Sequence, residues 1–251
     1  MNVWGITDIG LVRKDNQDAY AMRQRTQSGH TACVVCDGMG GTAGGQLASR
    51  IAVDTWLSEI ERILQPEMTP QQLREASSYA VALANRAIRA EAERSEECRN
   101  MGTTLVAAVG YAGGAVVSNV GDSRAYHISG DGITRITKDH SLVESMVERG
   151  DITDEEARHH PNRNLITRAL GPDLLTECDG YICPMRPGEF LLLCTDGLVN
   201  TVTDQEMLFE IIHGDGPENS LARMLEISKS RGAKDNVTAV LMENAGIREG
   251  K

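Results

Sequence analysis

Four aspartates lie at the ends of short apolar runs that are spread over almost the whole chain of 251 residues. Asp37, Asp122 and Asp196 each follow such a run, and Asp235 stands just before one. Each run is β-branched or continuously apolar, so each predicts a buried strand with a carboxylate at its end. If folding gathers these carboxylates, they form a ligand set for hard divalent cations, because no Cys or His accompanies them. The pattern then indicates metal-assisted phosphate chemistry.

The same residues are open to a simpler interpretation, because an Asp-Gly pair is above all a turn signal. The chain has five such pairs, at Asp37, Asp131, Asp179, Asp196 and Asp215. Asp131 lies between two strand-like runs, where a hairpin turn explains it completely. Asp37 and Asp196 differ because unbroken apolar runs precede them. The pattern alone leaves a shared metal site and unconnected turns as alternatives.

Composition limits the class of protein. Apolar residues make up 41% of the chain and charged residues 24%, which is typical of a soluble globular protein. No stretch approaches the roughly 18 apolar residues of a membrane span. The N-terminal sequence lacks the basic and apolar regions of a signal peptide, so we expect a cytoplasmic protein with no membrane partner. A net charge of −11 argues against nucleic acid as a partner.

The six cysteines agree with a reducing compartment. Cys33 and Cys36 form a C-x-x-C pair, which would suggest zinc or redox chemistry. They lie in a predicted strand, however, where residues three apart point to opposite faces. No second pair completes a zinc site. We therefore expect buried, reduced thiols.

No linker, repeat or low-complexity segment divides the chain, so we expect one catalytic domain at 1–245 and a flexible tail at 246–251. Eleven strands are predicted, at 3–7, 19–22, 31–36, 103–110, 114–120, 124–128, 133–137, 164–169, 180–183, 190–194 and 237–242. Helices are predicted at 45–64, 70–97, 141–149, 204–213 and 217–231. Consecutive hairpins with separate helical blocks indicate an α+β fold. So many strands favour two stacked, mostly antiparallel β-sheets flanked by helical layers, an α-β-β-α sandwich.

Eight short strings occur in a recognisable order, and each alone would be a weak signal. They lie at 13–18, 37–41, 101–104, 121–124, 139–141, 167–171, 195–198 and 235–238. Together they resemble the bacterial branch of the metal-dependent serine/threonine protein phosphatases, the type 2C family. The resemblance covers about residues 3 to 242. It implies a β-sandwich between two helical layers and hydrolysis of phosphoserine and phosphothreonine.

The resemblance also implies a set of metal ligands for two manganese or magnesium ions and often a third. Asp37 would bridge the two central ions, and the Gly38 carbonyl would help to hold one of them. Asp196 and Asp235 would hold the other central ion. Asp122 would share the more loosely bound third ion with Asp196.

Two further residues complete the implied site. Asp18 would be an outer-shell ligand that acts through water, and Arg13 would bind the substrate phosphate. The planar guanidinium fork of Arg13 suits phosphate oxygens in a way that lysine cannot match. Paired ions roughly 3.5–4 Å apart lower the pKa of a bridging water and neutralise phosphoryl charge. No protein nucleophile is needed, so we expect direct in-line attack by water.

The chain departs from its relatives at the general acid. Eukaryotic members have a histidine where Met39 stands, and many bacterial members have His and Glu where this chain has Thr42 and Gln46. The proton donor to the leaving oxygen is therefore not assigned. We expect His140 to be a structural histidine, and Arg124 and Arg168 to support the fold. The segment at about 140–163 corresponds to the variable flap beside the active site, as either a solvated helix and loop or a substrate-docking surface.

The main hypothesis is a monomeric phosphatase that acts on phosphorylated proteins and opposes a bacterial serine/threonine kinase. An alternative is a catalytically inactive relative that serves as a phosphorylation-linked binding module. The four aspartates Asp37, Asp122, Asp196 and Asp235 are all present, which argues against it. A phosphohydrolase with an aspartyl intermediate would need paired aspartates near one strand end, and the string at 195–198 has only one.

Overall fold

The computed structural model describes residues 1–246, without the side chains of residues 42 and 43. The tail expected at 246–251 lies outside the described residues except for Gly246. None of the helices in the described range combines the length and apolar character that crossing a membrane requires.

Two antiparallel sheets form the centre of the molecule. One has the order β1 (Asn2–Asp8), β11 (Val237–Glu243), β10 (Phe190–Cys194), β7 (Arg124–Ser129) and β8 (Gly132–Arg135). The other has the order β2 (Asp18–Arg23), β3 (Thr31–Met39), β5 (Leu105–Tyr111), β6 (Gly114–Val120) and β9 (Asp179–Pro184), and the short β4 (Gly102–Thr103) also pairs with β3. The predicted α+β class and the pair of stacked sheets are confirmed.

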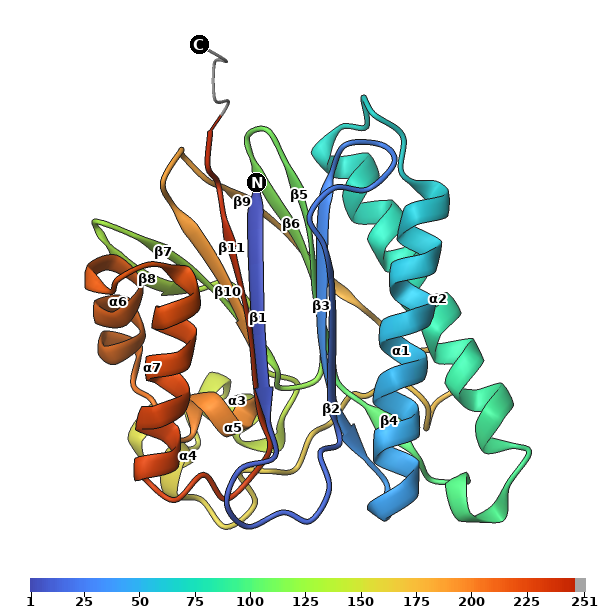
Figure 1. Ribbon diagram of the computed structural model, residues 1–251. Coiled ribbons are helices and arrows are strands. Elements are labelled where there is room, and N and C mark those ends of the chain that lie inside the picture. The colour runs from blue at the N-terminus through green and yellow to red at the C-terminus, as the bar shows by residue number, and fades with distance from the viewer. Residues whose placement is uncertain (247–251) are drawn as a thin grey trace.

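Helices cover both outer faces of the sheets, as Figure 1 shows. The long helices α1 (Gly41–Ile63) and α2 (Pro70–Ala92) pack on the β3-β5-β6 face, while α6 (Asp204–His213) and α7 (Pro217–Ser230) cover the β10-β11 face. Three apolar cores therefore separate four layers. Cys36 belongs to the core under α1 and α2, whereas Cys33 lies in the core between the sheets. Both thiols are free and buried, as expected from their spacing.

The start of α2 follows from its sequence. The Thr69 hydroxyl accepts a hydrogen bond from the Gln72 backbone N–H at 3.3 Å, and the Gln72 side chain accepts one from the Thr69 N–H at 2.8 Å. This capping box, with Pro70 in the first turn, fixes where the helix begins. The helix ends at Ala92, earlier than the predicted 97, and a separate 3-10 turn η1 (Glu96–Cys98) follows.

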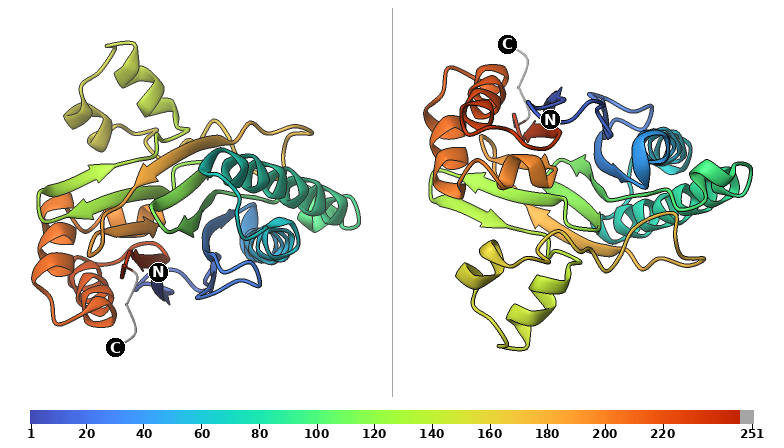
Figure 2. Two further views of the ribbon diagram at one scale, coloured as in Figure 1. Left: turned by 90° about the horizontal axis from the view of Figure 1, so that it is seen from above. Right: turned by 90° about the horizontal axis from the view of Figure 1, so that it is seen from below.

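Three further segments differ from the prediction. The predicted flap contains α3 (Leu142–Glu148), as expected, and a second helix α4 (Asp154–His159) that was not predicted; both project from the sandwich in Figure 2. The strand predicted at 164–169 is wrong, because its residues make only one isolated bridge, Ile166 to Ser141, and the next residue Leu170 makes another to Thr103 of the two-residue β4. Single bridges do not form a ladder, and Leu165 is 53% exposed. The short helix α5 (Asp196–Val199), directly after β10, was also not predicted.

Candidate functional site

Five aspartates lie at or near the ends of strands from both sheets. These strand ends are on the same end of the sandwich, the lower one in Figure 1. Asp18 opens β2 and stands opposite Asp37, which lies near the end of β3. Asp122 lies in the turn between β6 and β7, and Asp196 begins α5 directly after β10. Asp235 lies two residues before β11, whose first residue pairs with the last residue of β1. Antiparallel pairing thus brings carboxylates from both halves of the chain to the same end of the sandwich.

The backbone at Asp37 is held by hydroxyl groups from the strings that the sequence singled out. The Asp37 N–H donates to Thr104 Oγ1 at 2.9 Å. The Asp37 carbonyl accepts from the Thr103 hydroxyl at 2.8 Å and from the Thr104 N–H at 2.9 Å. Thr104 Oγ1 also lies 2.7 Å from Ser123 Oγ, next to Asp122. The two strings therefore fix Asp37 relative to Asp122.

Two of the carboxylates carry buried oxygens that lack a hydrogen-bond partner. Asp18 accepts a hydrogen bond from the Thr195 hydroxyl at 2.9 Å on one oxygen, and its Oδ1 has none. Asp196 accepts from the Asn200 side-chain amide at 3.2 Å, and its Oδ1 is also without a partner. A buried charged oxygen left in this way is costly unless a cation is close.

Burial is the largest cause of the raised pKa values of Asp18, Asp37, Asp122 and Asp196, and repulsion between carboxylates adds to it. The pKa of Asp18 rises to about 7, that of Asp122 to about 7 and that of Asp196 to about 6. The pKa of Asp37 lies well above its usual range, through burial and then through the charges of Asp18, Asp196, Asp122 and Asp235 in that order. These groups therefore act on one another electrostatically, although they come from distant parts of the sequence.

The residues present fit hard divalent cations. The donors are carboxylate oxygens, two of them without a hydrogen-bond partner, and a cation beside them would offset the burial and repulsion that raise the pKa of Asp37. In the described part of the chain no three His, Cys, Asp or Glu side chains are already grouped closely enough to enclose one ion. Ions of the Mg²⁺ type retain several waters and take few carboxylates, so they do not require an all-protein cage.

Arg13 lies at this edge, but it contacts a carboxylate rather than standing free. Its Nη2 donates to Asp235 Oδ2 at 2.7 Å, and the two side chains are 52% and 34% exposed. The sequence placed both residues in the site without predicting that they pair. The guanidinium supplies positive charge to one side of the acidic cluster, where it can also reach solvent.

Asn236 fixes the loop that carries Arg13. Its side-chain amide donates to the carbonyls of Ile9 at 2.9 Å and Asp15 at 3.1 Å, and its Oδ1 accepts from the Gln17 N–H at 2.8 Å. The sequence reasoning did not assign roles to Asn236, Thr104, Ser123 or Thr195. Their positions inside the recognised strings are the signal that could have identified them.

Gly38 has a packing reason that the sequence did not reveal. The family resemblance implied only that its carbonyl would help to hold an ion. The structure shows instead that a Cβ at Gly38 would lie 2.0 Å from the Gly45 carbonyl oxygen of α1 and 2.7 Å from the Gln17 carbonyl oxygen. Close packing of β3 against α1 therefore explains the glycine. Whether its carbonyl also serves a metal ion stays a prediction.

Arg124 and His140 support the turn that carries Asp122. Arg124 makes a bidentate ion pair with buried Asp139, with Nη2 to Oδ2 at 2.6 Å. His140 Nδ1 accepts from the Gly121 N–H at 3.0 Å, so the ring proton is on Nε2, which donates to Asp179 Oδ2 at 3.2 Å. Burial lowers the pKa of His140. This neutral, doubly hydrogen-bonded ring is the structural histidine that we expected.

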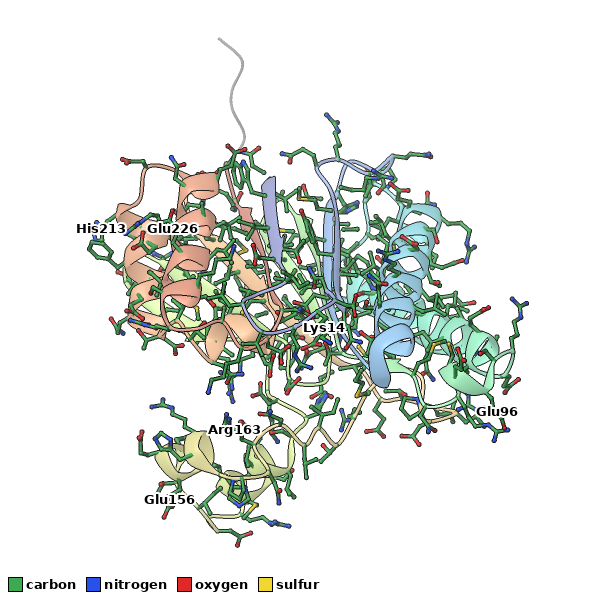
Figure 3. The ribbon with its side chains drawn as sticks, turned by 60° about the horizontal axis from the view of Figure 1, so that its bottom comes forward. Lys14, Glu96, Glu156, Arg163, His213 and Glu226 are labelled. Atoms are coloured by element: carbon green, nitrogen blue, oxygen red, sulfur yellow. The ribbon has the colours of Figure 1, made fainter. Side chains whose placement is uncertain are left out.

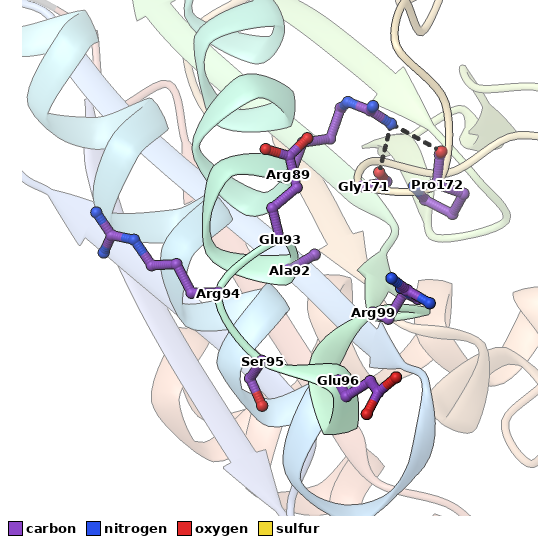
Figure 4. A pocket seen from close by; sticks show the side chains of 9 residues that line it. All are labelled: Arg89, Ala92, Glu93, Arg94, Ser95, Glu96, Arg99, Gly171 and Pro172. Atoms are coloured by element: carbon purple, nitrogen blue, oxygen red, sulfur yellow. Dashed lines mark hydrogen bonds between the residues drawn. The ribbon is translucent and has the colours of Figure 1, made fainter.

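A cleft of about 400 Å³ lies between the end of α2 and the Gly171-Pro172 loop (Figure 4). Arg89 bridges it by donating to the Pro172 carbonyl at 2.9 Å. Its charged lining alternates in sign, with three arginines and two glutamates. None of the five gathered aspartates contributes to it, so it is not the cation site.

Comparison with known proteins agrees with this geometry. The family model described as Protein phosphatase 2C matches residues 13–242. A Listeria innocua protein named "Serine/threonine phosphatase stp" is 33% identical over 249 residues, which cover 98% of this chain and 96% of that protein. A Streptococcus pneumoniae protein named "Protein phosphatase PhpP" is 31% identical over 244 residues, covering 96% and 97%.

Solved structures have the same fold. The serine/threonine phosphatase Stp1 from Staphylococcus aureus superposes with a TM-score of 0.90 at 34% identity, covering 96% of this chain and 94% of that one. The serine/threonine phosphatase PstP/Ppp from Mycobacterium tuberculosis superposes with a TM-score of 0.85 at 33% identity, covering 96% and 97%.

Proposed function

Because the chain belongs to the protein phosphatase 2C family of serine/threonine phosphatases, we propose that it hydrolyses phosphoserine and phosphothreonine in proteins with two or three Mn²⁺ or Mg²⁺ ions. The observation that supports the metal requirement is the group of five aspartates at one edge, with orphaned buried oxygens on Asp18 and Asp196. Cations beside such a cluster would offset the repulsion between its carboxylates at neutral pH.

The proposed ligands follow the family pattern. Asp37 would be a ligand of both central ions. The Gly38 carbonyl would help to hold one of these ions, and Asp196 and Asp235 would hold the other. Asp122 would hold the third ion together with Asp196. The fixed backbone of Asp37 and its link through Thr104 and Ser123 to the Asp122 turn support this assignment, because ligands of different ions must keep their spacing.

Asp18 has a supporting role in this proposal. Its Oδ2 is engaged by Thr195, and its free Oδ1 lies among the other carboxylates. A water between Asp18 and an ion would satisfy that oxygen, which is the outer position expected from the sequence.

Paired divalent ions, when bound, lower the pKa of water so that hydroxide is available near neutrality, and they neutralise charge on phosphoryl oxygens. The chain itself would position the substrate. Arg13 would exchange its single contact with Asp235 for the phosphate, since a guanidinium donates to a carboxylate or to a phosphate oxygen. This exchange frees Asp235 for its ligand role. We propose direct attack of water with no phosphorylated enzyme.

The biological setting is also a proposal. We propose that residues 1–245 act as one catalytic domain, as a monomer in the cytoplasm. Its partners would be phosphorylated proteins that a serine/threonine kinase modifies. An inactive binding module is not favoured, because the aspartates of the family pattern are all present.

The test is hydrolysis of a phosphothreonine peptide with Mn²⁺ and then with excess chelator, for wild type, Asp37→Ala and Asp131→Ala. Asp131 lies in the β7–β8 hairpin and is the matched control. We expect activity in wild type and in the control, loss with chelator, and loss of at least about a thousandfold in Asp37→Ala. Activity that survives chelation would exclude the metal mechanism. A trapped phosphoenzyme would exclude direct attack by water.

A further inference from the structure

The loop before Arg13 exposes three large apolar side chains, which we name the apolar lip. Ile9, Leu11 and Val12 are 37%, 61% and 65% exposed. Nine large hydrophobic side chains are exposed in the described residues, and three of them lie in this segment of four residues. A single exposed aliphatic side chain is ordinary, whereas a group of them marks a contact surface.

The exposure does not come from a loosely attached loop. Gly10 has a φ of +78°, and a Cβ there would lie 2.3 Å from the Asp235 carbonyl oxygen. The Leu11 N–H donates to the Ala233 carbonyl at 2.9 Å. The Asn236 side-chain amide donates to the carbonyls of Ile9 and Asp15. These two residues flank the segment that contains the rest of the lip and Arg13. The backbone is therefore fixed, and its apolar side chains are held in water at a free-energy cost that burial against a partner would remove.

The lip adjoins the proposed phosphate position. Val12 directly precedes Arg13, whose guanidinium contacts Asp235 of the acidic cluster. Figure 3 shows Lys14, the next residue, in the middle of the face that carries the site. Lys14 and Asp15 follow with opposite charges, so the loop itself gives no preference for the sign of a partner's charge. What it offers beside the phosphate is apolar area.

We propose that the apolar lip binds a large apolar side chain one or two residues from the phosphorylated residue of the substrate. The inference rests on the proposed function and specifies its substrate class as phosphoprotein segments with an aliphatic or aromatic flank. Consecutive Cα atoms are about 3.8 Å apart, so residues this close to a phosphoresidue held at Arg13 reach the neighbouring side chains of the loop. Lip contacts form when the peptide binds and persist in the transition state, so they lower KM more than they raise kcat.

The experiment compares two phosphothreonine peptides that differ only in their flanks, with leucine or serine on both sides of the phosphothreonine. Initial rates with Mn²⁺ are measured for wild type, the double variant Leu11→Ser/Val12→Ser and the control Phe209→Ser. Phe209 is 60% exposed on α6, away from the loop. Wild-type hydrolysis of p-nitrophenyl phosphate, which has no flanking residues, tests the proposed function separately.

We expect wild type and Phe209→Ser to favour the leucine peptide about tenfold in kcat/KM, mostly through KM. In the double variant this ratio falls to about one because KM for the leucine peptide rises. Equal rates on both peptides in wild type would overturn the inference even if p-nitrophenyl phosphate is hydrolysed. Failure to hydrolyse both phosphothreonine peptides as well as p-nitrophenyl phosphate would instead refute the proposed function. A wild-type dimer in sedimentation that the double variant abolishes would assign the lip to a second copy of the chain and overturn the inference.

Discussion

At the scale of single residues, Gly38 shows how packing limits the site. Its missing Cβ leaves room for the Gly45 carbonyl of α1, which would otherwise lie 2.0 Å away. We expect Gly38→Ala to lower the free energy of unfolding by at least about 2 kcal/mol, because backbone on both sides must move. Gly130→Ala is the control, since nothing lies within 4 Å of its added Cβ. Urea unfolding of both variants measures the difference, and equal stability would contradict the packing argument.

The candidate residues themselves could be predicted because their signals are local. Each aspartate closes or precedes an apolar run, and Arg13 lies in a recognised string. The sequence did not show that Arg13 pairs with Asp235, 222 residues away. The partners of Asp18 and Asp37, the Thr195 and Thr104 hydroxyls, were equally hidden. Contacts of this kind depend on which strand ends become neighbours, and no local pattern encodes that.

At the scale of elements, prediction succeeded where two local signals agreed. The bounds of β6, β10 and α6 are those predicted, because strong apolar patterns meet clear turn or cap residues there. The segment 164–169 failed because an apolar and β-branched run indicates a strand only if another strand is available. Helix α4 was missed because it is short and has no buried residue, so its sequence lacks an apolar stripe. Its Thr153 to Glu156 capping box was the available signal.

The flap helices give a prediction about local stability. Neither α3 nor α4 buries a residue fully, and ion pairs tie α3 to the sandwich, from Arg135 to Glu144 at 2.5 Å and between Lys138 and Glu148. We expect amides at 142–163 to exchange with solvent much faster than those of β5 and β6, through local opening. The double variant Glu144→Gln/Glu148→Gln should accelerate exchange in the flap about two- to fivefold at low salt, and less at high salt. Hydrogen-exchange mass spectrometry measures both.

The control for the flap is Glu226→Gln, which removes an ion pair with Arg223 on α7. That helix also buries Leu221 and Met224 against the sheet, so it should exchange as in wild type. Exchange in the flap as slow as in β5 would contradict the idea that few contacts hold it.

At the scale of the whole molecule, repulsion between negative charges opposes folding. The chain carries a net charge of −11, and folding brings five aspartates to the same end of the sandwich, where their charges raise the pKa of Asp37. Hydrophobic burial in the three cores must offset this repulsion in the metal-free protein. Divalent cations bound there would remove it, so we expect cation binding and global stability to be linked.

The pH dependence of the metal-free protein tests this link. The pKa values of Asp18 and Asp122 rise from 3.8 to about 7 on folding, so the folded state retains protons that the unfolded state has released. The stability due to these groups is complete below about pH 4 and is lost as the pH rises towards 7. We expect chelator-treated Asp122→Asn to be about 1–2 kcal/mol more stable than wild type at pH 7.5 and nearly equal to it at pH 4.5.

Urea unfolding in chelator at both pH values measures this difference, with Asp131→Asn as the exposed control. Adding Mn²⁺ at pH 7.5 should stabilise wild type more than Asp122→Asn, because the cation then replaces the protons that the carboxylates have lost. Equal stabilisation of the two proteins would mean that Asp122 contributes nothing to cation binding. A wild type that is more stable than Asp122→Asn in chelator at pH 7.5 would show that the carboxylates do not repel one another, and the electrostatic basis of the site would be wrong.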